Sequence, residues 1–188
     1  MGICAIGNGV LRAVFFDRDG VLNHAIVKQG KPYPPASLAD VVLNVEAKPA
    51  LQALASAGFL LLGITNQPDV ARGTTRRERV EEINQYLLSQ LPLQTILVCY
   101  HDDAAQCECR KPSPGLLLNA AKTHDITMAA SFMIGDRWRD IEAGHRAGCR
   151  SIWLKGNYDE PVPQRPHYET DSLLAAATWI LNSSNSSL

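Results

Sequence analysis

Three apolar runs in this chain each end in a polar motif that could carry chemistry. The runs are VFFDRDG (residues 14–20), LLLGITNQ (60–67) and FMIGDRWRD (132–140). Apolar runs without alternating polar residues are typical of parallel strands that are buried on both faces. Because ligands of such sheets bind beyond the carboxyl ends of the strands, we expect the three motifs to meet at one edge of a sheet.

Helical patterns alternate with the apolar runs along the chain, as they do in sheets built from crossover units. We expect strands at 11–16, 60–65, 95–100, 131–134 and 151–154, and helices at 49–57, 114–124 and 137–147. A further helix should begin at a capping box, Thr75–Glu78, and continue to Leu91. The pattern predicts one α/β domain over residues 1–181 with a Rossmann-like, doubly wound parallel sheet. Lys31–Pro35 should form a stiff loop, and the polar tail 182–188 should be disordered.

Composition argues against several classes of protein. At 188 residues, of which 46% are hydrophobic, the chain can bury one sizeable core. Its net charge of -1 argues against binding to nucleic acid through bulk electrostatics. The sequence contains no apolar stretch of membrane-spanning length and no convincing signal peptide. We therefore expect a cytoplasmic monomer with reduced thiols, whose partner is a small molecule rather than nucleic acid or a membrane.

Acidic residues follow two of the three apolar runs. Asp17 and Asp19 flank Arg18 after the first run, and Asp136 follows the third, with Asp140 one helical turn later. Carboxylates that meet at one sheet edge repel one another unless a cation lies between them, and oxygen ligands suit Mg²⁺. Taken singly, an Asp-x-Asp-Gly is usually a turn, and an Asp before a helix is usually an N-cap. The ordered set favours a metal-dependent site instead.

A polar segment near the middle of the chain has the spacing Cys99-x-His101-x₅-Cys107-x-Cys109. A disulfide disagrees with a reducing compartment and with the odd total of five cysteines, and no Cys-x-x-Cys redox pair is present. Buried inert thiols disagree with so polar a loop. Three thiolates and one imidazole complete a tetrahedral zinc site with no open position, so we expect structural Zn²⁺.

The last cysteine of this cluster directly precedes Arg110 and Lys111. A loop fixed by zinc would hold both cations in place before a ligand arrives, which lowers the entropy cost of binding. We expect Lys111 to meet a phosphate and Arg110 to meet another group of the same ligand. Cys4 and Cys149 lie apart from the cluster and are expected to be small core residues.

Taken together and in order, the motifs resemble those of the haloacid dehalogenase (HAD) superfamily. The matching residues are Asp17-Arg18-Asp19-Gly20, Thr65-Asn66, Lys111, and Gly135-Asp136 with Asp140. The second aspartate of the first motif narrows the resemblance to phosphatases and mutases. The short segments between the motifs leave no room for a cap domain, so we expect a capless HAD-like fold with an open site.

The resemblance implies a chemical role for each acidic residue. Asp17 would attack phosphorus to form an aspartyl-phosphate, and Asp19 would serve as general acid and then general base. Asp17, Asp136 and the backbone carbonyl of Asp19 would bind a catalytic Mg²⁺. Asp140 would play a supporting part by orienting Lys111 or a metal-bound water.

The remaining matched residues would bind the substrate. The resemblance places Thr65, Asn66 and Lys111 around the phosphoryl oxygens, where they would position and stabilise charge. Arg110 would contact a remote group of the substrate. Specificity in a capless enzyme must come from short loops, here 23–35, 69–73 and the neighbourhood of Arg110.

The zinc segment resembles one branch of the superfamily, which holds the D-glycero-D-manno-heptose 1,7-bisphosphate phosphatases and the histidinol-phosphate phosphatases. TNQPDVARG and CRKPSPG are similar to the heptose enzymes, whereas the x₅ spacing is more like the histidinol-phosphate enzymes. The expected activity is Mg²⁺-dependent hydrolysis of a small sugar phosphate, with heptose 1,7-bisphosphate (7-phosphate) first and histidinol phosphate or another small metabolite as the alternative. A zinc-stabilised binding module, whose aspartates only cap turns, is the non-enzymatic alternative.

Overall fold

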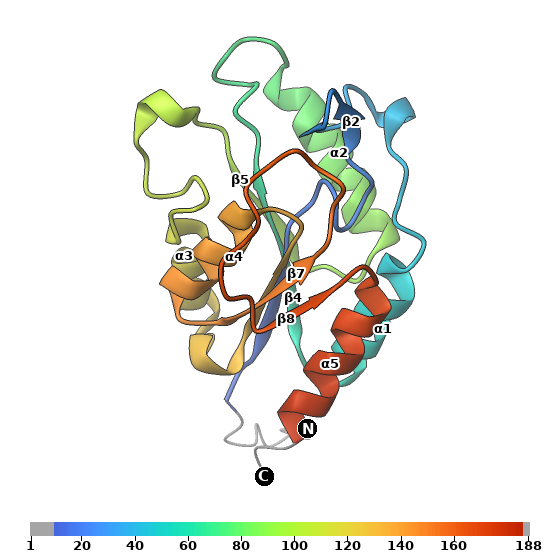
Figure 1. The fold of residues 1–188 in the computed structure, drawn as a ribbon, viewed down its shortest axis with the longest axis vertical. Helices are drawn as coiled ribbons and strands as arrows, with labels where there is room; N and C mark the ends of the chain where they lie inside the picture. The colour runs from blue at the N-terminus through green and yellow to red at the C-terminus, as the bar shows by residue number, and fades with distance from the viewer. Residues whose placement is uncertain (1–9, 186–188) are drawn as a thin grey trace, which may run out of the picture.

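The computed structural model describes residues 10–185 and shows a parallel six-stranded sheet with helices on both faces (Figure 1). The strand order is β5-β4-β1-β6-β7-β8, and a separate hairpin pairs β2 with β3. The strands are β1 (Ala13–Phe16), β2 (Ile26–Lys28), β3 (Lys31–Tyr33), β4 (Leu60–Asn66), β5 (Thr95–Cys99), β6 (Phe132–Gly135), β7 (Arg150–Leu154) and β8 (Tyr168–Thr170). The helices are α1 (Ala47–Ser56), α2 (Arg77–Gln90), α3 (Gly115–His124), α4 (Trp138–Ala147) and α5 (Leu173–Asn185), with short 3₁₀ turns η1 (Leu38–Asp40), η2 (Asp103–Ala105) and η3 (Met128–Ala130).

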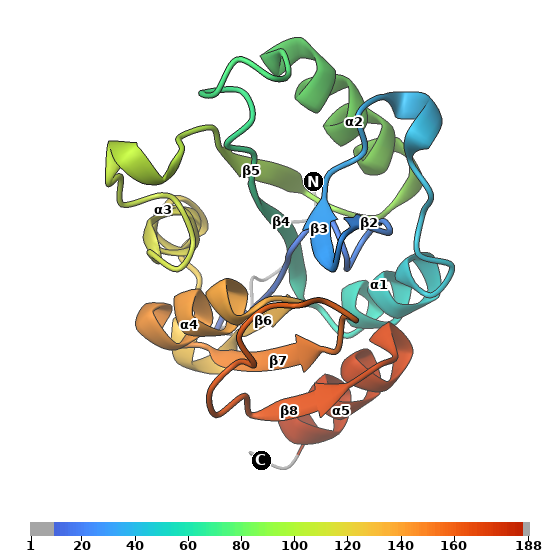
Figure 2. The same ribbon diagram turned by 45° about the horizontal axis from the view of Figure 1, so that its top comes forward.

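Side chains of the central strand β1 point alternately into two cores. Val14 and Phe16 belong to the core shared with α1 and α5, whereas Ala13 and Phe15 belong to the core shared with α3 and α4. All four residues are fully buried, which explains why the run carries no polar alternation. Figures 1 and 2 show α1 and α5 side by side on one face of the sheet, and α3 and α4 together on the other.

The chain reverses its direction across the sheet at β1. It passes from β1 to β4 and β5 on one side, and only later to β6, β7 and β8 on the other. A reversal of this kind opens a crevice at the carboxyl ends of the strands that flank it. The three motifs of the sequence follow β1, β4 and β6, which are neighbours in the sheet. The predicted doubly wound parallel sheet, with its motifs at one edge, is confirmed.

The expected strands and helices are all present, and their ends differ from the predicted ones by at most two residues. The prediction of a capping box at Thr75–Glu78 is wrong. Arg76 occupies the N-cap position of α2, and its side chain makes no capping hydrogen bond.

The stiff loop expected at Lys31–Pro35 is also wrong in part, because Lys31–Tyr33 pairs as strand β3 with β2. Lys28 lies opposite Lys31, so only Gln29 and Gly30 form the turn, with φ of 50° and 73°. Two residues of positive φ are typical of a type I′ hairpin turn. The hairpin lies over the carboxyl ends of the sheet, as Figure 2 shows, and forms one wall of the pocket described below.

Two elements near the C-terminus were not expected from the sequence. β8 extends the sheet beyond β7, and α5 covers the α1 face. Ser172 accepts a hydrogen bond from the Ala175 amide (3.2 Å), and Glu46 accepts one from the Leu174 amide (3.2 Å). These bonds satisfy amides in the first turn of α5. The helix continues to Asn185, so residues 182–185 of the predicted disordered tail are helical, whereas 186–188 lie outside the described residues.

Within residues 10–185, no helix is both long and apolar enough to cross a membrane.

Candidate active site

Lys111 lies at the centre of the carboxyl-end site. Its Nζ is 2.6 Å from Asp17 Oδ1 and 2.6 Å from Asp140 Oδ1, and it donates to the Ile64 carbonyl at 2.9 Å. The Asn66 side chain fixes the backbone of Lys111, donating to its carbonyl at 3.0 Å and accepting from its amide at 3.1 Å. The end of β4 therefore holds the loop that carries the lysine. Asn66, which was expected to bind phosphate, uses both atoms of its amide for this purpose.

Burial and neighbouring charges shift the pKa values of Asp17 and Lys111. Burial raises the pKa of Asp17 to about 6, and the neighbouring Lys111 ammonium limits the rise. Burial alone would lower the pKa of Lys111, but the charges of Asp140 and Asp17 outweigh it and raise the pKa above its usual range. Lys111 is therefore cationic at neutral pH, and it favours the ionised form of Asp17.

Three carboxylates form a candidate metal site beside the lysine. One oxygen from each of Asp17, Asp136 and Asp140 lies within 4.8 Å of the others, and all three residues are buried. Neither oxygen of Asp136 has a hydrogen-bond partner of regular geometry among the described residues, although the Tyr158 hydroxyl lies nearby. Burial, followed by the charges of Asp17 and Asp140, raises the pKa of Asp136 well above its usual range. An unpaired buried carboxylate among like charges fits a hard divalent cation, which prefers oxygen ligands.

Gly20 permits the close approach of Asp136. Its φ is +106°, and a Cβ placed there would lie 1.8 Å from Asp136 Oδ2. Positive φ and the absence of a side chain are both needed at this turn, which explains the glycine of the Asp-x-Asp-Gly motif.

Asp19 does not join the three carboxylates. Its side chain accepts hydrogen bonds from Arg18 (2.8 Å), Asn23 (3.0 Å) and Gln67 (2.8 Å), and Gln67 also donates to Thr65 Oγ1 (3.0 Å). Residues outside the predicted site thus orient two predicted ones. The position of Gln67 directly after the Thr65-Asn66 motif was the only available signal for its role.

Arg18 links this network to the protein interior. It is fully buried, and its Nη1 donates to Asn84 of α2 at 2.9 Å. A buried guanidinium needs acceptors on several sides, and here Asp19 and Asn84 supply them. The middle residue of the Asp-x-Asp motif therefore holds the second aspartate in place.

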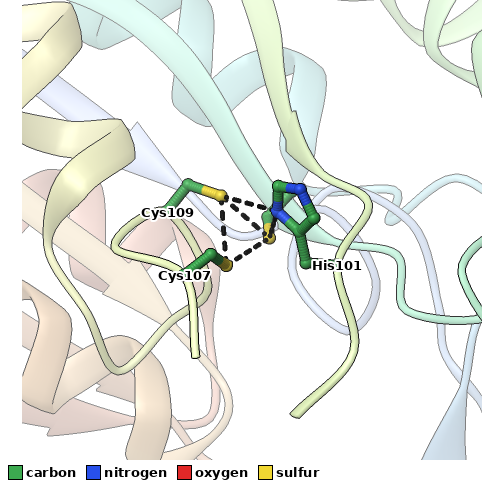
Figure 3. A group of neighbouring side chains, drawn as sticks. His101, Cys107 and Cys109 are labelled. Atoms are coloured by element: carbon green, nitrogen blue, oxygen red, sulfur yellow. Dashed lines mark hydrogen bonds between the residues drawn. The ribbon is translucent and has the colours of Figure 1, made fainter. Parts of the chain in front are cut away.

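The four predicted zinc ligands come together (Figure 3). The sulfur–sulfur distances are 3.2 Å for Cys99–Cys109, 3.3 Å for Cys107–Cys109 and 3.7 Å for Cys99–Cys107, and His101 Nδ1 lies 3.2 Å from the Cys109 sulfur. Sulfur–zinc bonds of about 2.3 Å imply sulfur–sulfur edges of about 3.8 Å in a regular tetrahedron. The cluster could hold zinc after small shifts.

The pKa shifts differ between the thiols of the cluster. Burial raises the pKa of Cys99 and of Cys109 above the usual range of a thiol. Burial would raise the pKa of Cys107, but hydrogen bonds from neighbours, the Cys109 thiol first, lower it to about 7. The four described cysteines form no disulfide, and Cys149 lies buried away from the cluster. Cys4 lies outside the described residues.

Arg110 points to a carboxylate at the rim of the site. Its Nε and Nη2 donate to the two oxygens of Asp103 at 3.0 and 3.3 Å, and these hydrogen bonds hold the pKa of Asp103 near 2. Asp103 is also 3.2 Å from Arg139 and 3.5 Å from Arg72. Neither Asp103 nor Arg139 was among the predicted site residues.

A pocket at the carboxyl ends joins most of these groups. It is lined by Asp17, Asp19, Thr65, Asn66, Lys111, Arg137, Arg139 and Asp140, together with Pro32, Tyr33 and Pro34. The loop after β7 contacts one of the lining residues and the hairpin: Glu160 accepts from Arg137 Nε at 2.8 Å, and the Asp159 amide donates to the Gly30 carbonyl at 2.7 Å. This loop was missed because its contacts join segments far apart in the sequence, whereas segment 23–35, which contains the hairpin, was expected to contribute to specificity and does line the pocket.

The comparisons with known proteins agree with the geometry. A HAD-hydrolase-like family model matches residues 108–176. D-glycero-beta-D-manno-heptose-1,7-bisphosphate 7-phosphatase from Helicobacter pylori is 37% identical over 151 residues, covering 76% of this chain and 83% of the relative. The enzyme of the same name from Escherichia coli strain K12 is 32% identical over 185 residues, covering 91% and 88%.

Solved structures give the same assignment. D,D-heptose 1,7-bisphosphate phosphatase from B. bronchiseptica, complexed with magnesium and phosphate, has a TM-score of 0.75 and 25% identity, covering 93% of this chain and 99% of that one. A HAD-like phosphatase of Mesorhizobium loti has a TM-score of 0.76 and 26% identity, covering 93% and 88%. The chain therefore belongs to the HAD-like hydrolases and, within them, to the phosphatase family that includes the D-glycero-beta-D-manno-heptose-1,7-bisphosphate 7-phosphatases.

Proposed function

We propose that this phosphatase removes the 7-phosphate of D-glycero-β-D-manno-heptose 1,7-bisphosphate, using Mg²⁺ and an aspartyl-phosphate intermediate. The single observation that carries the mechanism is the buried group formed by Asp17, Lys111 and Asp140, with Asp136 unpaired beside it. The named relatives support the substrate. We also propose a monomer in the cytoplasm, where thiols that bind zinc stay reduced.

Asp17 is the proposed nucleophile. Lys111, at 2.6 Å, favours its carboxylate form and is placed to meet the phosphoryl oxygens that Asp17 would attack. Asp140 keeps the Lys111 ammonium in position at 2.6 Å. Thr65, aligned by Gln67, faces the same pocket and would bind another phosphoryl oxygen.

Asp19 is the proposed general acid and base. It would protonate the sugar oxygen as the phosphorus–oxygen bond breaks, and then take a proton from the water that hydrolyses the aspartyl-phosphate. Its side chain lines the same pocket as Asp17.

Asp17, Asp136 and the Asp19 carbonyl would hold Mg²⁺. When bound, this cation would neutralise charge on the phosphoryl oxygens. Cys99, His101, Cys107 and Cys109 would hold Zn²⁺ in a closed structural site.

Arg110 is the proposed contact for the remote phosphate. It adjoins Lys111 and lies at the rim with Arg72 and Arg139. Histidinol phosphate, the alternative substrate, carries its protonated amine on the carbon next to the phosphorylated CH2 group, and its remote end is an imidazole, which is neutral or cationic and never anionic. Three arginines disfavour a cation there and favour a second anionic group.

Asp17→Asn should reduce phosphatase activity to background, because an amide cannot attack phosphorus. Hydrolysis of an aryl phosphate with Mg²⁺ is the measurement, and circular dichroism should show an intact fold. Near-wild-type turnover in folded protein, with mass spectrometry excluding deamidation to Asp, would remove Asp17 from the nucleophile role.

Asp19→Asn should slow hydrolysis of a sugar phosphate by roughly 10²–10⁴-fold, the usual scale for general acid–base catalysis. The loss should be smaller for an aryl phosphate, because a phenolate leaves without a proton. Comparison of kcat on the two substrates checks this. Equal losses on both would argue against the acid role.

Purified protein should contain about one zinc per chain, because the ligand set forms one closed tetrahedral site. Cys107→Ala should lose the zinc and lower activity by releasing Arg110 and Lys111, with little change in circular dichroism. Cys149→Ala, which removes a buried thiol outside the cluster, is the matched control and should keep the metal. Fully active, reduced wild-type protein without zinc would contradict the structural site.

Arg110→Ala should raise KM for the bisphosphate by about tenfold, since a charge-assisted contact is lost, and leave KM for an aryl phosphate nearly unchanged. Arg146→Ala is the control, because Arg146 pairs with Glu142 at 2.7 Å in the last turn of α4. A similar rise for both substrates would mean that Arg110 acts on the transferred phosphoryl group.

A further inference from the structure

Asp103 is held by arginines from three separate parts of the chain. Arg110 follows the zinc cluster and lies 3.0 Å away, Arg139 lies in the first turn of α4 at 3.2 Å, and Arg72 follows β4 at 3.5 Å. These residues form the arginine rim of the site. Arg139 also lines the pocket that contains Asp17, so the arginine rim is continuous with the catalytic centre.

The arginine rim carries more donors than Asp103 can satisfy. One carboxylate faces three guanidinium groups, and the only other acidic group paired with them is Asp69, 3.4 Å from Arg72, among the described residues. Arg139 Nε is buried and has no hydrogen-bond partner in the described part of the chain. A phosphate dianion has more charge and more acceptor oxygens than a carboxylate, so it would satisfy this rim better.

Two arginines of the rim are anchored, whereas the carboxylate is not. Arg110 adjoins Lys111, whose backbone Asn66 clamps, and Arg139 stacks over the Trp138 ring at 5.0 Å. Asp103 begins the single turn η2 on an exposed loop, and its side chain is 58% exposed. The ion pairs of this exposed carboxylate are individually weak and can be exchanged at small cost.

We propose that Asp103 is an internal substitute for the remote phosphate of the substrate and is displaced when a bisphosphate binds to Arg110 and Arg139. Asp103 thereby sets specificity. It neutralises the arginine rim when no second phosphate is present, and it competes with one when it arrives. Arg139 is the second specificity residue beside Arg110. The proposal rests on the proposed function in one respect, that the substrate carries a second anionic group.

The test is competitive inhibition of aryl phosphate hydrolysis by fructose 1,6-bisphosphate and by fructose 6-phosphate. Asp103→Asn removes the charge with little change of shape, so the inhibition constant of the bisphosphate should fall by about threefold to tenfold, the scale of a few exposed ion pairs. The inhibition constant of the monophosphate and the rate of aryl phosphate turnover should not change. Arg139→Gln should raise the inhibition constant of the bisphosphate more than that of the monophosphate, and in the double variant the gain from Asp103→Asn should shrink.

Asp102→Asn is the matched control, because it removes the same charge from the same loop. The Asp102 carboxylate accepts from the Ala104 amide at 3.0 Å, a bond that asparagine can keep, and it forms no ion pair among the described residues. An equal fall of the inhibition constant in Asp102→Asn would mean that any negative charge on this loop has the same effect, and it would overturn the proposal.

An unchanged or higher inhibition constant for the bisphosphate in Asp103→Asn would also overturn it, because Asp103 would then only assemble the arginines. This result is independent of the natural substrate. Failure of the wild type to hydrolyse heptose bisphosphate, with aryl phosphate still turned over, would instead reject the proposed substrate and leave the inhibition experiment readable.

Discussion

The ammonium group of Lys111 joins three distant segments of the chain at one point. Asp17 comes from the end of β1, Asp140 from the first turn of α4, and Lys111 from the loop after the zinc cluster. The lysine residue is only 2% exposed, so its charge must be paired. Removal of one partner from a buried ion pair typically costs about 3–5 kcal/mol, which makes the three positions interdependent. The sheet order, the Asn66 clamp and the zinc cluster all bring this lysine to the same place.

The core of the fold could be predicted because its signals are local. The run from Ala13 to Phe16 is buried on both faces, and Gly58 and Gly148 mark helix ends with positive φ. The hairpin and β8 could not be predicted in the same way, since each strand is three residues long and half exposed. Such strands are stabilised by the pocket wall and the sheet edge against which they lie, which are tertiary contacts that carry no periodicity.

The residues of the candidate site that could be predicted are those whose own side chains would carry the chemistry. The carboxylates, Lys111 and the zinc ligands were found because each has a distinctive residue type at a fixed spacing, and the structure brings the ligand groups together. The residues that orient them were missed. Arg18 and Gln67 hold Asp19, and Asp103 holds the arginine rim, through side-chain bonds that depend on distances between loops. Only the assembled fold defines such distances.

The two ends of the site carry excess charge of opposite sign, and each excess indicates the charge of the group that would bind there. At the buried end, three carboxylates face one ammonium, an excess of negative charge that calls for a divalent cation. At the rim, the arginines outnumber the acidic groups paired with them, an excess of positive charge that calls for an anion. A magnesium-bound phosphoryl group with a second phosphate at its far end would neutralise both. When no second phosphate is bound, Asp103 is the carboxylate that pairs with all three arginines of the rim.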